Sequence, residues 1–299
     1  MDSVRRLKAT TLADNLTFHG SLLGQWGLSI LLEIESTDGQ EHTILLDTGA
    51  EKEALIFNIN RLKLSLRNLE AIVLSHGHPD HTAATVELAR RSRRKVQVIA
   101  HPHTFKRRYT VTKKAKRVLS QVPKGEREKD LQRVGARLRF TKEPCQIIPG
   151  VVTTGEIPRQ TSFEKISGKR IIQLGRQSQR DYLLDDQAII VNVHDQGAWV
   201  FSGCAHSGII NTLRRAESLA QRVPIHAIIG GMHLVSKTKE EIEPIVNALK
   251  QYTPKLISPC HCTGFRATSM IHEAFERQFI LNFSGRTISS WKTTLPSII

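Results

Sequence analysis

The stretch Ser75-His76-Gly77-His78-Pro79-Asp80-His81 decides the fold and gathers much of the chemistry of this chain. Three imidazoles and one carboxylate lie within six consecutive residues. The short apolar run at 71–74 predicts a buried strand before it, and residues 83–91 predict a helix after it. The stretch is therefore expected on a strand-to-helix loop at the end of a sheet, where open α/β folds place their sites.

The residue types of this loop favour a metal site. Imidazole binds borderline metals such as zinc and iron, and a carboxylate adds a harder oxygen ligand. His76 and His78 alternate on extended backbone and can face one side, while Asp80 and His81 follow at a turn and can reach a second position. Two metals about 3.5–4 Å apart are the usual dinuclear arrangement. The alternative is a surface loop that is rich in histidine by chance, and the strand-loop-helix context argues against it.

Length and charge limit the classes that this chain can belong to. The 299 residues, 39% of them hydrophobic, suffice for a large single domain or two modest ones. Lys and Arg number 43 against 28 Asp and Glu, a net charge of +15, which favours phosphorylated metabolites, nucleic acid or another anionic partner. With four cysteines and no apolar leader we expect a cytoplasmic protein. We expect no membrane association, since no apolar run approaches the length of a bilayer span.

Asp47 follows an expected strand in the sequence Leu46-Asp47-Thr48-Gly49. That strand, 42–46, is predicted to form a hairpin with 30–36. An aspartate at a strand end beside a metal loop can accept a hydrogen bond from a ligating imidazole and fix its tautomer. The alternative is a turn or helix-cap aspartate.

A second group of donors follows another expected hairpin, 187–193 with 198–201. Its second strand runs into Cys204 and His206, directly before an amphipathic helical pattern. Thiolate and imidazole two residues apart are suitable metal ligands. His206 is favoured as a ligand, whereas for Cys204 a ligand and a buried thiol are both open.

Three more histidines lie after expected strands. His101 could line the pocket or be a hydrogen-bonded structural histidine. His233 follows two glycines, which let backbone approach a ligand, so it could contact substrate or pack at the loop. His261 stands between Cys260 and Cys262, which point away from it in extended backbone. These cysteines are expected to pack or to support the site, because no CxxC pair occurs to form a zinc knuckle.

Residues 105–139 are dense in Lys and Arg and lack strand periodicity. We expect a basic, partly helical insertion over the sheet near the mouth of the site. It could be an electrostatic funnel for an anionic substrate, or a solvated charged face, and the second interpretation is slightly favoured. The polar stretch 160–179 is a second candidate excursion.

The pattern His76-x-His78-x-Asp80-His81 resembles the signature of the metallo-β-lactamase fold superfamily. The resemblance implies an α/β fold, an αββα sandwich, here as a single domain over 1–299. It also implies two divalent metal ions, with zinc favoured and iron or manganese as alternatives. His261 matches the final histidine ligand of the family. In the wider family an aspartate commonly bridges the metals where Cys204 stands, so this position is a departure.

Five stretches narrow the resemblance to the dihydropterin-ribofuranosylaminobenzene-phosphate synthase group, namely 27–29, 75–81, 202–211, 230–234 and 260–264. The expected ligand set follows the superfamily, except that Cys204 is a departure and His206 takes the place of a histidine from an earlier Gly-His-Thr segment, which this chain lacks. His76, His78 and His206 would hold one metal, and Asp80, His81 and His261 the other. Cys204 and a solvent hydroxide would lie between them, Asp80 would also act in catalysis on a proton, and Asp47 and His233 would support the site or contact substrate.

The resulting hypothesis is a metal-dependent hydrolase. A metal-activated hydroxide would attack a phosphoester or lactone in an anionic small-molecule substrate. The alternative is a transferase that condenses a dihydropterin diphosphate with an arylamine riboside phosphate and releases pyrophosphate. A nuclease and a binding protein with little turnover are less favoured, so nucleic acid is a less favoured partner. A homo-oligomer is compatible with the sequence.

Overall fold

The computed structural model describes residues 1–299 except 19, 112–116, 166–168, 222 and 292–299. Its strands hydrogen-bond in the order β16-β15-β14-β13-β1-β2-β3-β4-β5-β8. Strand β1 (Val4–Ala13) joins two halves of this path, because it pairs antiparallel with β2 and parallel with β13. The remaining strands of this sheet are β9 (Cys145–Ile148) and β10 (Val151–Thr153), a hairpin beside β13, and β17 (Thr287–Ser289) beside β1.

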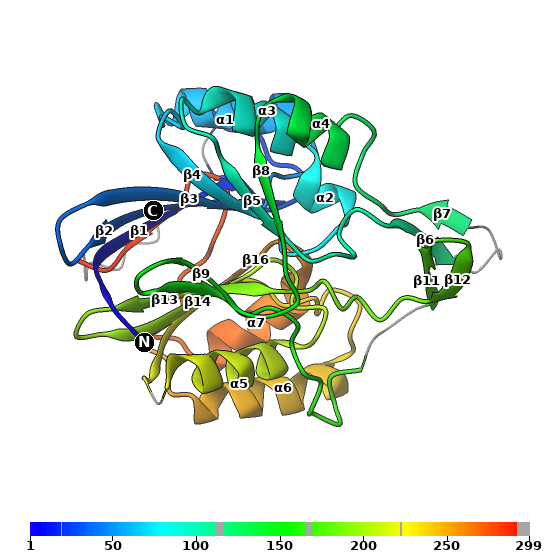
Figure 1. Ribbon diagram of the computed structural model, residues 1–299. Helices are drawn as coiled ribbons and strands as arrows, with labels where there is room; N and C mark the ends of the chain where they lie inside the picture. Colours follow the sequence, from blue (N-terminus) through cyan, green and yellow to red (C-terminus); the bar gives the residue numbers. More distant parts are fainter. Residues whose placement is uncertain (19, 112–116, 166–168, 222, 292–299) are drawn as a thin grey trace.

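The first half carries the predicted hairpin and the strand before the histidine loop. Its elements are β2 (Ser29–Ser36), β3 (Glu41–Leu46), β4 (Leu69–Val73), β5 (Gln97–Ala100) and β8 (Arg137–Phe140), with helices α1 (Lys52–Arg61), α2 (Pro79–Thr82), α3 (Thr85–Arg91) and α4 (Glu128–Arg133). Helices α1, α3 and α4 cover the outer face of this half (Figure 1).

The second half contains the other predicted hairpin and two parallel strands. Its elements are β13 (Ala188–Val193), β14 (Gly197–Ser202), β15 (Ile225–Gly231) and β16 (Leu256–Cys260), with helices α5 (Ile209–Ala220), α6 (Lys239–Gln251) and α7 (Phe265–Ala274) and the short helix η1 (His261–Thr263). Helices α5, α6 and α7 pack on its outer face (Figure 1).

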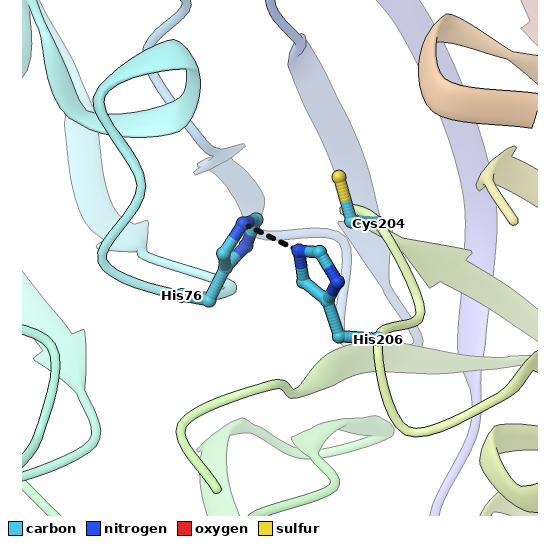
Figure 2. A group of neighbouring side chains, drawn as sticks. All are labelled: His76, Cys204 and His206. Carbon is cyan, nitrogen blue, oxygen red and sulfur yellow. Dashed lines mark hydrogen bonds between the residues drawn. The ribbon is translucent and has the colours of Figure 1, made fainter. Parts of the chain in front are cut away.

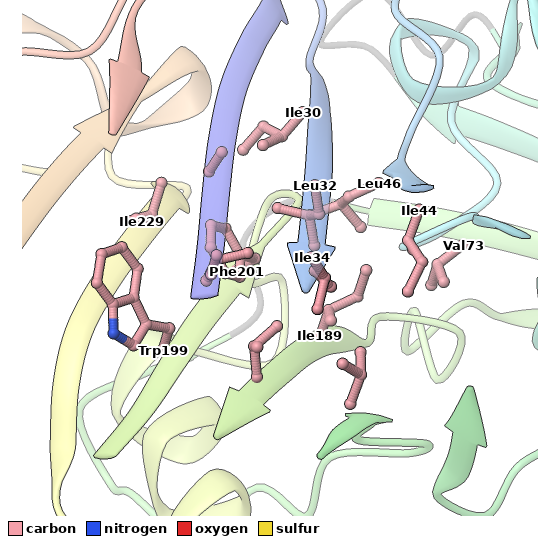
Figure 3. Packing of buried hydrophobic residues seen from close by; sticks show 14 of the residues in the cluster. Ile30, Leu32, Ile34, Ile44, Leu46, Val73, Ile189, Trp199, Phe201 and Ile229 are labelled. Atoms are coloured by element: carbon pink, nitrogen blue, oxygen red, sulfur yellow. The ribbon is translucent and has the colours of Figure 1, made fainter. Parts of the chain in front are cut away.

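The two halves face each other across an apolar core. Ile44 and Val73 from the first half and Ile189 and Phe201 from the second are fully buried in one cluster (Figure 3). Strands β13 and β14 are buried at every residue, and β3 and β4 are buried over their last three, as expected where a sheet is covered on both sides. The order is therefore helices, strands, strands, helices, and the predicted αββα sandwich in a single domain is confirmed.

The basic stretch 105–139 contains a helix as expected, α4, but it also contains strands, which its lack of strand periodicity did not predict. It contributes β6 (Arg107–Val111) and β7 (Arg117–Leu119), which join β11 (Lys169–Leu174) and β12 (Gln177–Arg180) in a separate four-stranded sheet. Its end, β8, pairs with β5 in the main sheet. Residues 112–116 and 166–168 of the two excursions lie outside the described residues. We call the four strands the small sheet, and it projects from one side of the sandwich (Figure 1).

Within the described part of the chain, no helix combines the length and the apolar character needed to cross a membrane.

Candidate metal centre

The predicted site residues come together at one end of the sandwich because they all follow strands at their carboxyl ends. Asp47 follows β3, residues 75–81 follow β4, and Cys204 with His206 follow β14. His233 follows β15, and His261 follows β16. Strand β3 runs parallel to β4, and β14, β15 and β16 run parallel to one another. Parallel neighbours bring their carboxyl ends to one edge, which explains the convergence.

The first donor group consists of His76, His78 and His206. Nε2 of His76 lies 2.9 Å from Nδ1 of His78 and 3.2 Å from Nε2 of His206. Figure 2 shows the rings of His76 and His206 pointing toward each other from opposite sides of the site, with Cys204 beside them. Burial lowers the pKa of His78 to about 3, and burial followed by neighbouring imidazoles lowers the pKa of His76 well below its usual range. These rings are therefore neutral and offer lone pairs to a cation.

The second donor group consists of Asp80, His81 and His261. Oδ2 of Asp80 lies 3.6 Å from Nε2 of His81 and 3.6 Å from Nε2 of His261. Nε2 of His261 is buried without a hydrogen-bond partner, although the ring is held in place on its other side. Burial opposes ionisation of Asp80, but His81 and His261 outweigh it and hold the pKa well below its usual range. An ionised carboxylate at this point suits a metal ligand better than a proton donor.

Cys204 is shared by both groups. Its Sγ and the ligand atoms of His76 and His206 all lie within 4.8 Å of one another. The same is true of its Sγ and the ligand atoms of His81 and His261. The Sγ is also 3.1 Å from Nε2 of His81. Burial, followed by neighbouring Cys262, raises the pKa of Cys204 well above its usual range, so a thiolate here requires a positive partner.

Asp47 orients both donor groups. Its Oδ2 lies 2.7 Å from Nδ1 of His81 and accepts the Ser75 hydroxyl at 2.6 Å. The same hydroxyl lies 2.9 Å from Nδ1 of His76. One carboxylate thus directs Nε2 of His81 into the site, and through Ser75 it directs Nε2 of His76 there as well. Burial opposes protonation of His81, but Asp47 and Asp80 prevail and raise its pKa to about 9.

The backbone at Asp47 and Gly203 allows Asp47, Ser75 and His76 to approach one another closely. Asp47 has a φ of 58°, in the left-handed region that non-glycine residues rarely occupy. Gly203 packs so closely on Ser75 that a Cβ at this position would collide with its hydroxyl. A larger residue at 203 would therefore displace the Ser75 hydroxyl from Asp47 and His76. Such strain and close contact concentrate at functional sites.

Two contributors to the site were missed in the sequence. Ser75 directly precedes the first histidine, but its position alone does not indicate a hydrogen bond to Asp47. Asn15 lies just beyond β1, and its Oδ1 is 2.9 Å from Nδ1 of His261. The neighbouring Asp14 accepts the His261 backbone N–H at 2.6 Å. The only available signal was a pair of polar residues at the end of a strand.

The remaining predicted residues separate into neighbours of the site and structural groups. His233 and Cys262 form a third donor group with Cys204, within 4.8 Å of one another. The His233 backbone N–H lies 3.3 Å from Sγ of Cys262, so this cysteine supports the site. Cys260 packs in the central core. His101 is buried and lies 2.9 Å from the Glu156 carboxylate, which gives it a structural role.

The donor set fits divalent metal ions of borderline character. The two donor groups offer five imidazole nitrogens, one carboxylate and one shared sulfur. Opposed, buried Nε2 atoms and the unpartnered Nε2 of His261 are what a cation between these groups would satisfy. Zinc and iron suit imidazole with thiolate, whereas magnesium prefers oxygen ligands alone. The chain therefore has the residues to hold two such ions.

Comparison with known proteins agrees with this geometry. A family model described as the metallo-beta-lactamase superfamily matches residues 27–158. The chain is 31% identical over 291 residues to the 7,8-dihydropterin-6-methyl-4-(beta-D-ribofuranosyl)-aminobenzene-5'-phosphate synthase of Methanocaldococcus jannaschii, covering 95% of this chain and 97% of that protein. It is 28% identical over 277 residues to an uncharacterized protein of the same organism, covering 93% and 98%.

Two solved structures share the fold. A metal-dependent hydrolase of the beta-lactamase superfamily superposes with a TM-score of 0.74 at 21% identity, covering 94% of this chain and 98% of the other. A metallo-beta-lactamase fold protein from Bacillus subtilis gives a TM-score of 0.55 at 11% identity, covering 94% and 99%. With the full-length match to the synthase, these findings show that the chain belongs to the metallo-β-lactamase superfamily, in the group that resembles the methanogen synthase.

Proposed function

We propose that this protein is a divalent-metal-dependent hydrolase that acts on an anionic small molecule carrying a phosphoester or a lactone. The observation that supports this most strongly is the thiol of Cys204, which lies within 4.8 Å of ligand atoms from both donor groups. A donor shared by two groups is what a pair of closely spaced ions requires. When bound, two such ions lower the pKa of water toward about 7 and stabilise negative charge on oxygen.

The residues of the chain have separate tasks in this proposal. The first donor group and the second donor group hold one ion each, with zinc favoured over iron and manganese. Asp47 keeps both groups in register through His81 and Ser75. Asp80 acts as an ionised ligand, and its part in moving a proton stays a prediction. The proposal also includes an anionic substrate, supported by the net charge of +15.

The test compares His78→Ala with His272→Ala. His78 belongs to the first donor group, whereas His272 is an exposed histidine on α7. Metal content and hydrolysis are measured with phosphomonoester, phosphodiester and lactone substrates after loading with zinc, iron or manganese. We expect His78→Ala to lose bound metal and to slow hydrolysis by roughly a hundredfold, and His272→Ala to behave as the wild type. Unchanged activity in His78→Ala would remove the site as proposed.

A second candidate function is the transfer reaction, favoured by the 31% identity that spans 95% of the chain. In it, an arylamine riboside phosphate would displace pyrophosphate from a dihydropterin diphosphate. The two proposals separate when both substrates are incubated with metal-loaded protein and the products are identified by mass. A coupled product supports transfer, and its absence alongside ester hydrolysis supports the hydrolase.

A further inference from the structure

A pocket opens beside the first donor group and carries basic side chains. His206 and His233 line it on the side of the metal centre. Arg170, from β11, and Lys237, between β15 and α6, line it elsewhere, with the exposed Lys165 at its edge. These cations come from separate segments of the chain, so the fold gathers them at one place.

Arg170 lies on the inner face of the small sheet together with a second arginine. In the β6–β11 register, Thr110 pairs with Arg170 and Arg108 with Ile172, so Arg108 and Arg170 face the same side. The guanidinium of Arg108 is fully buried and neutralised, with Asp185 at 2.7 Å and Asp181 at 3.2 Å. Arg170 is partly exposed and lines the pocket. Of this pair, only Arg170 lines the pocket, and Asp181 acts on its charge as well.

Lys237 also lines the pocket. Its side chain is 12% exposed, and its Nζ lies 3.4 Å from the carboxylate of Glu241, which is 51% exposed. An ion pair with a solvated partner is weak, so this lysine can also interact with a ligand anion.

One carboxylate, that of Glu164, also lines the pocket, but it is already engaged. Its oxygens accept the backbone N–H groups of Ile210 and Asn211 at 2.9 and 3.0 Å, in the first turn of α5. It also accepts the Thr161 hydroxyl at 2.9 Å. The positive end of the helix offsets its charge, so the ligand-facing part of the pocket keeps a positive balance.

We propose that Arg170 and Lys237 form an anion subsite that binds a phosphoryl group of the substrate next to His206. This inference rests on the proposed function, because it places the reacting bond of the same substrate at the donor groups. A guanidinium matches a phosphoryl group with paired N–H donors, and an ammonium adds a point charge. The substrate class is then a phosphate ester whose charged group is anchored beside the metal centre by Arg170 of the small sheet and by Lys237, which lies outside that sheet.

The test measures binding of inorganic phosphate to metal-loaded protein by calorimetry. The variants are Arg170→Gln and Lys237→Gln, with Arg176→Gln as the control, since Arg176 is exposed at the tip of the small sheet. Acetohydroxamic acid, which is neutral when free in solution and chelates metal through its hydroxamate group, is the second ligand. We expect each of the first two variants to weaken phosphate binding by roughly tenfold to a hundredfold, with hydroxamate affinity and metal content unchanged.

Three outcomes would overturn the subsite: phosphate affinity equal to the wild type in both variants, an equal loss of phosphate and hydroxamate, or no phosphate binding by the wild type. Lys237→Gln keeps the test decisive if Arg170→Gln disturbs the small sheet, because Lys237 lies outside it. Binding is measured without turnover. A protein that binds phosphate through Arg170 but hydrolyses nothing would therefore contradict the proposed function and leave the subsite intact.

Discussion

At the scale of single residues, the site depends on how one carboxylate is used twice. Asp47 lies 2.7 Å from the His81 ring nitrogen that faces away from the site, and it reaches His76 through the Ser75 hydroxyl. Both imidazoles consequently present Nε2 to the same space. A buried carboxylate in this position also compensates charge that a bound cation would leave on the histidines.

Asp47→Asn tests this double role. The amide keeps the shape but loses the charge, so His81 and Ser75 are no longer both held as donors, and metal affinity should fall by roughly tenfold to a hundredfold. A chelator competition titration measures it. Asp38→Asn, in the exposed turn between β2 and β3, is the matched control. Equal chelator midpoints for Asp47→Asn and the wild type would contradict the role.

Cys204→Asp tests whether the shared thiol is a ligand. A carboxylate can replace a thiolate between two ions, whereas it cannot replace a buried apolar thiol without cost. We therefore expect Cys204→Asp to retain metal and Cys204→Ala to lose it, as read by elemental analysis. Cys260→Ala, at a thiol buried in the central core, should retain metal like the wild type. A Cys204→Ala protein with full metal content would show that the thiol serves packing alone.

The residues most accessible to sequence reasoning were those on one contiguous loop. The spacing of the histidines and the aspartate within 75–81 predicted a metal loop. The expected strand before Asp47 predicted that Asp47 lies beside this loop. Ser75 and Asn15 were missed because their roles depend on side-chain direction, and serine and asparagine occur in many turns. The structure brings all the predicted ligand residues together, and their function as ligands stays a prediction.

At the scale of elements, the small sheet is tied to the histidine loop by buried charge. Arg108 on β6 pairs with Asp181 and Asp185, and Asp185 also accepts the backbone N–H of Gly77 at 2.8 Å. Within a basic stretch, this arginine is thus a structural anchor and no part of a solvated face. Sequence periodicity could not reveal these strands, because β12 is exposed on both sides and shows no alternation.

Arg108→Met should destabilise the protein strongly. It leaves two buried carboxylates without their partner, which costs about 3–5 kcal/mol of unfolding free energy. Chemical denaturation measures the loss. Arg107→Met, at the exposed neighbouring residue, should change stability by less than about 0.5 kcal/mol. Similar denaturation midpoints for the two variants would contradict a buried anchor.

Glu126 gives the first half a pH-dependent element. Its Oε2 accepts the Val86 N–H in the first turn of α3 at 2.6 Å, and burial raises its pKa from 4.5 to about 7. The folded state therefore holds this proton to higher pH than the unfolded state does. As pH rises from about 4.5 to 7, the wild type should lose stability relative to Glu126→Gln. Thermal unfolding of both proteins at pH 5 and pH 8 measures the difference in stability between them. The prediction is refuted if the stability of the wild type relative to Glu126→Gln is the same at both pH values or greater at pH 8.

At the scale of the whole molecule, the candidate metal centre lies at the seam between the two halves of the sandwich. His76 and His81 come from the first half, whereas Cys204, His206 and His261 come from the second. The αββα order could be predicted because the sequence patterns of both hairpins and of the apolar strands are clear. The small sheet could not, since its polar strands come from two separate stretches and gain their pairing only in the folded chain.

The most direct test of the account is an anomalous-scattering map from crystals of metal-loaded protein. The account predicts two peaks per chain on either side of the Cys204 sulfur. One should lie among His76, His78 and His206, and the other among Asp80, His81 and His261. A map with no peak at these groups, or with metal bound only elsewhere, would contradict the central claim.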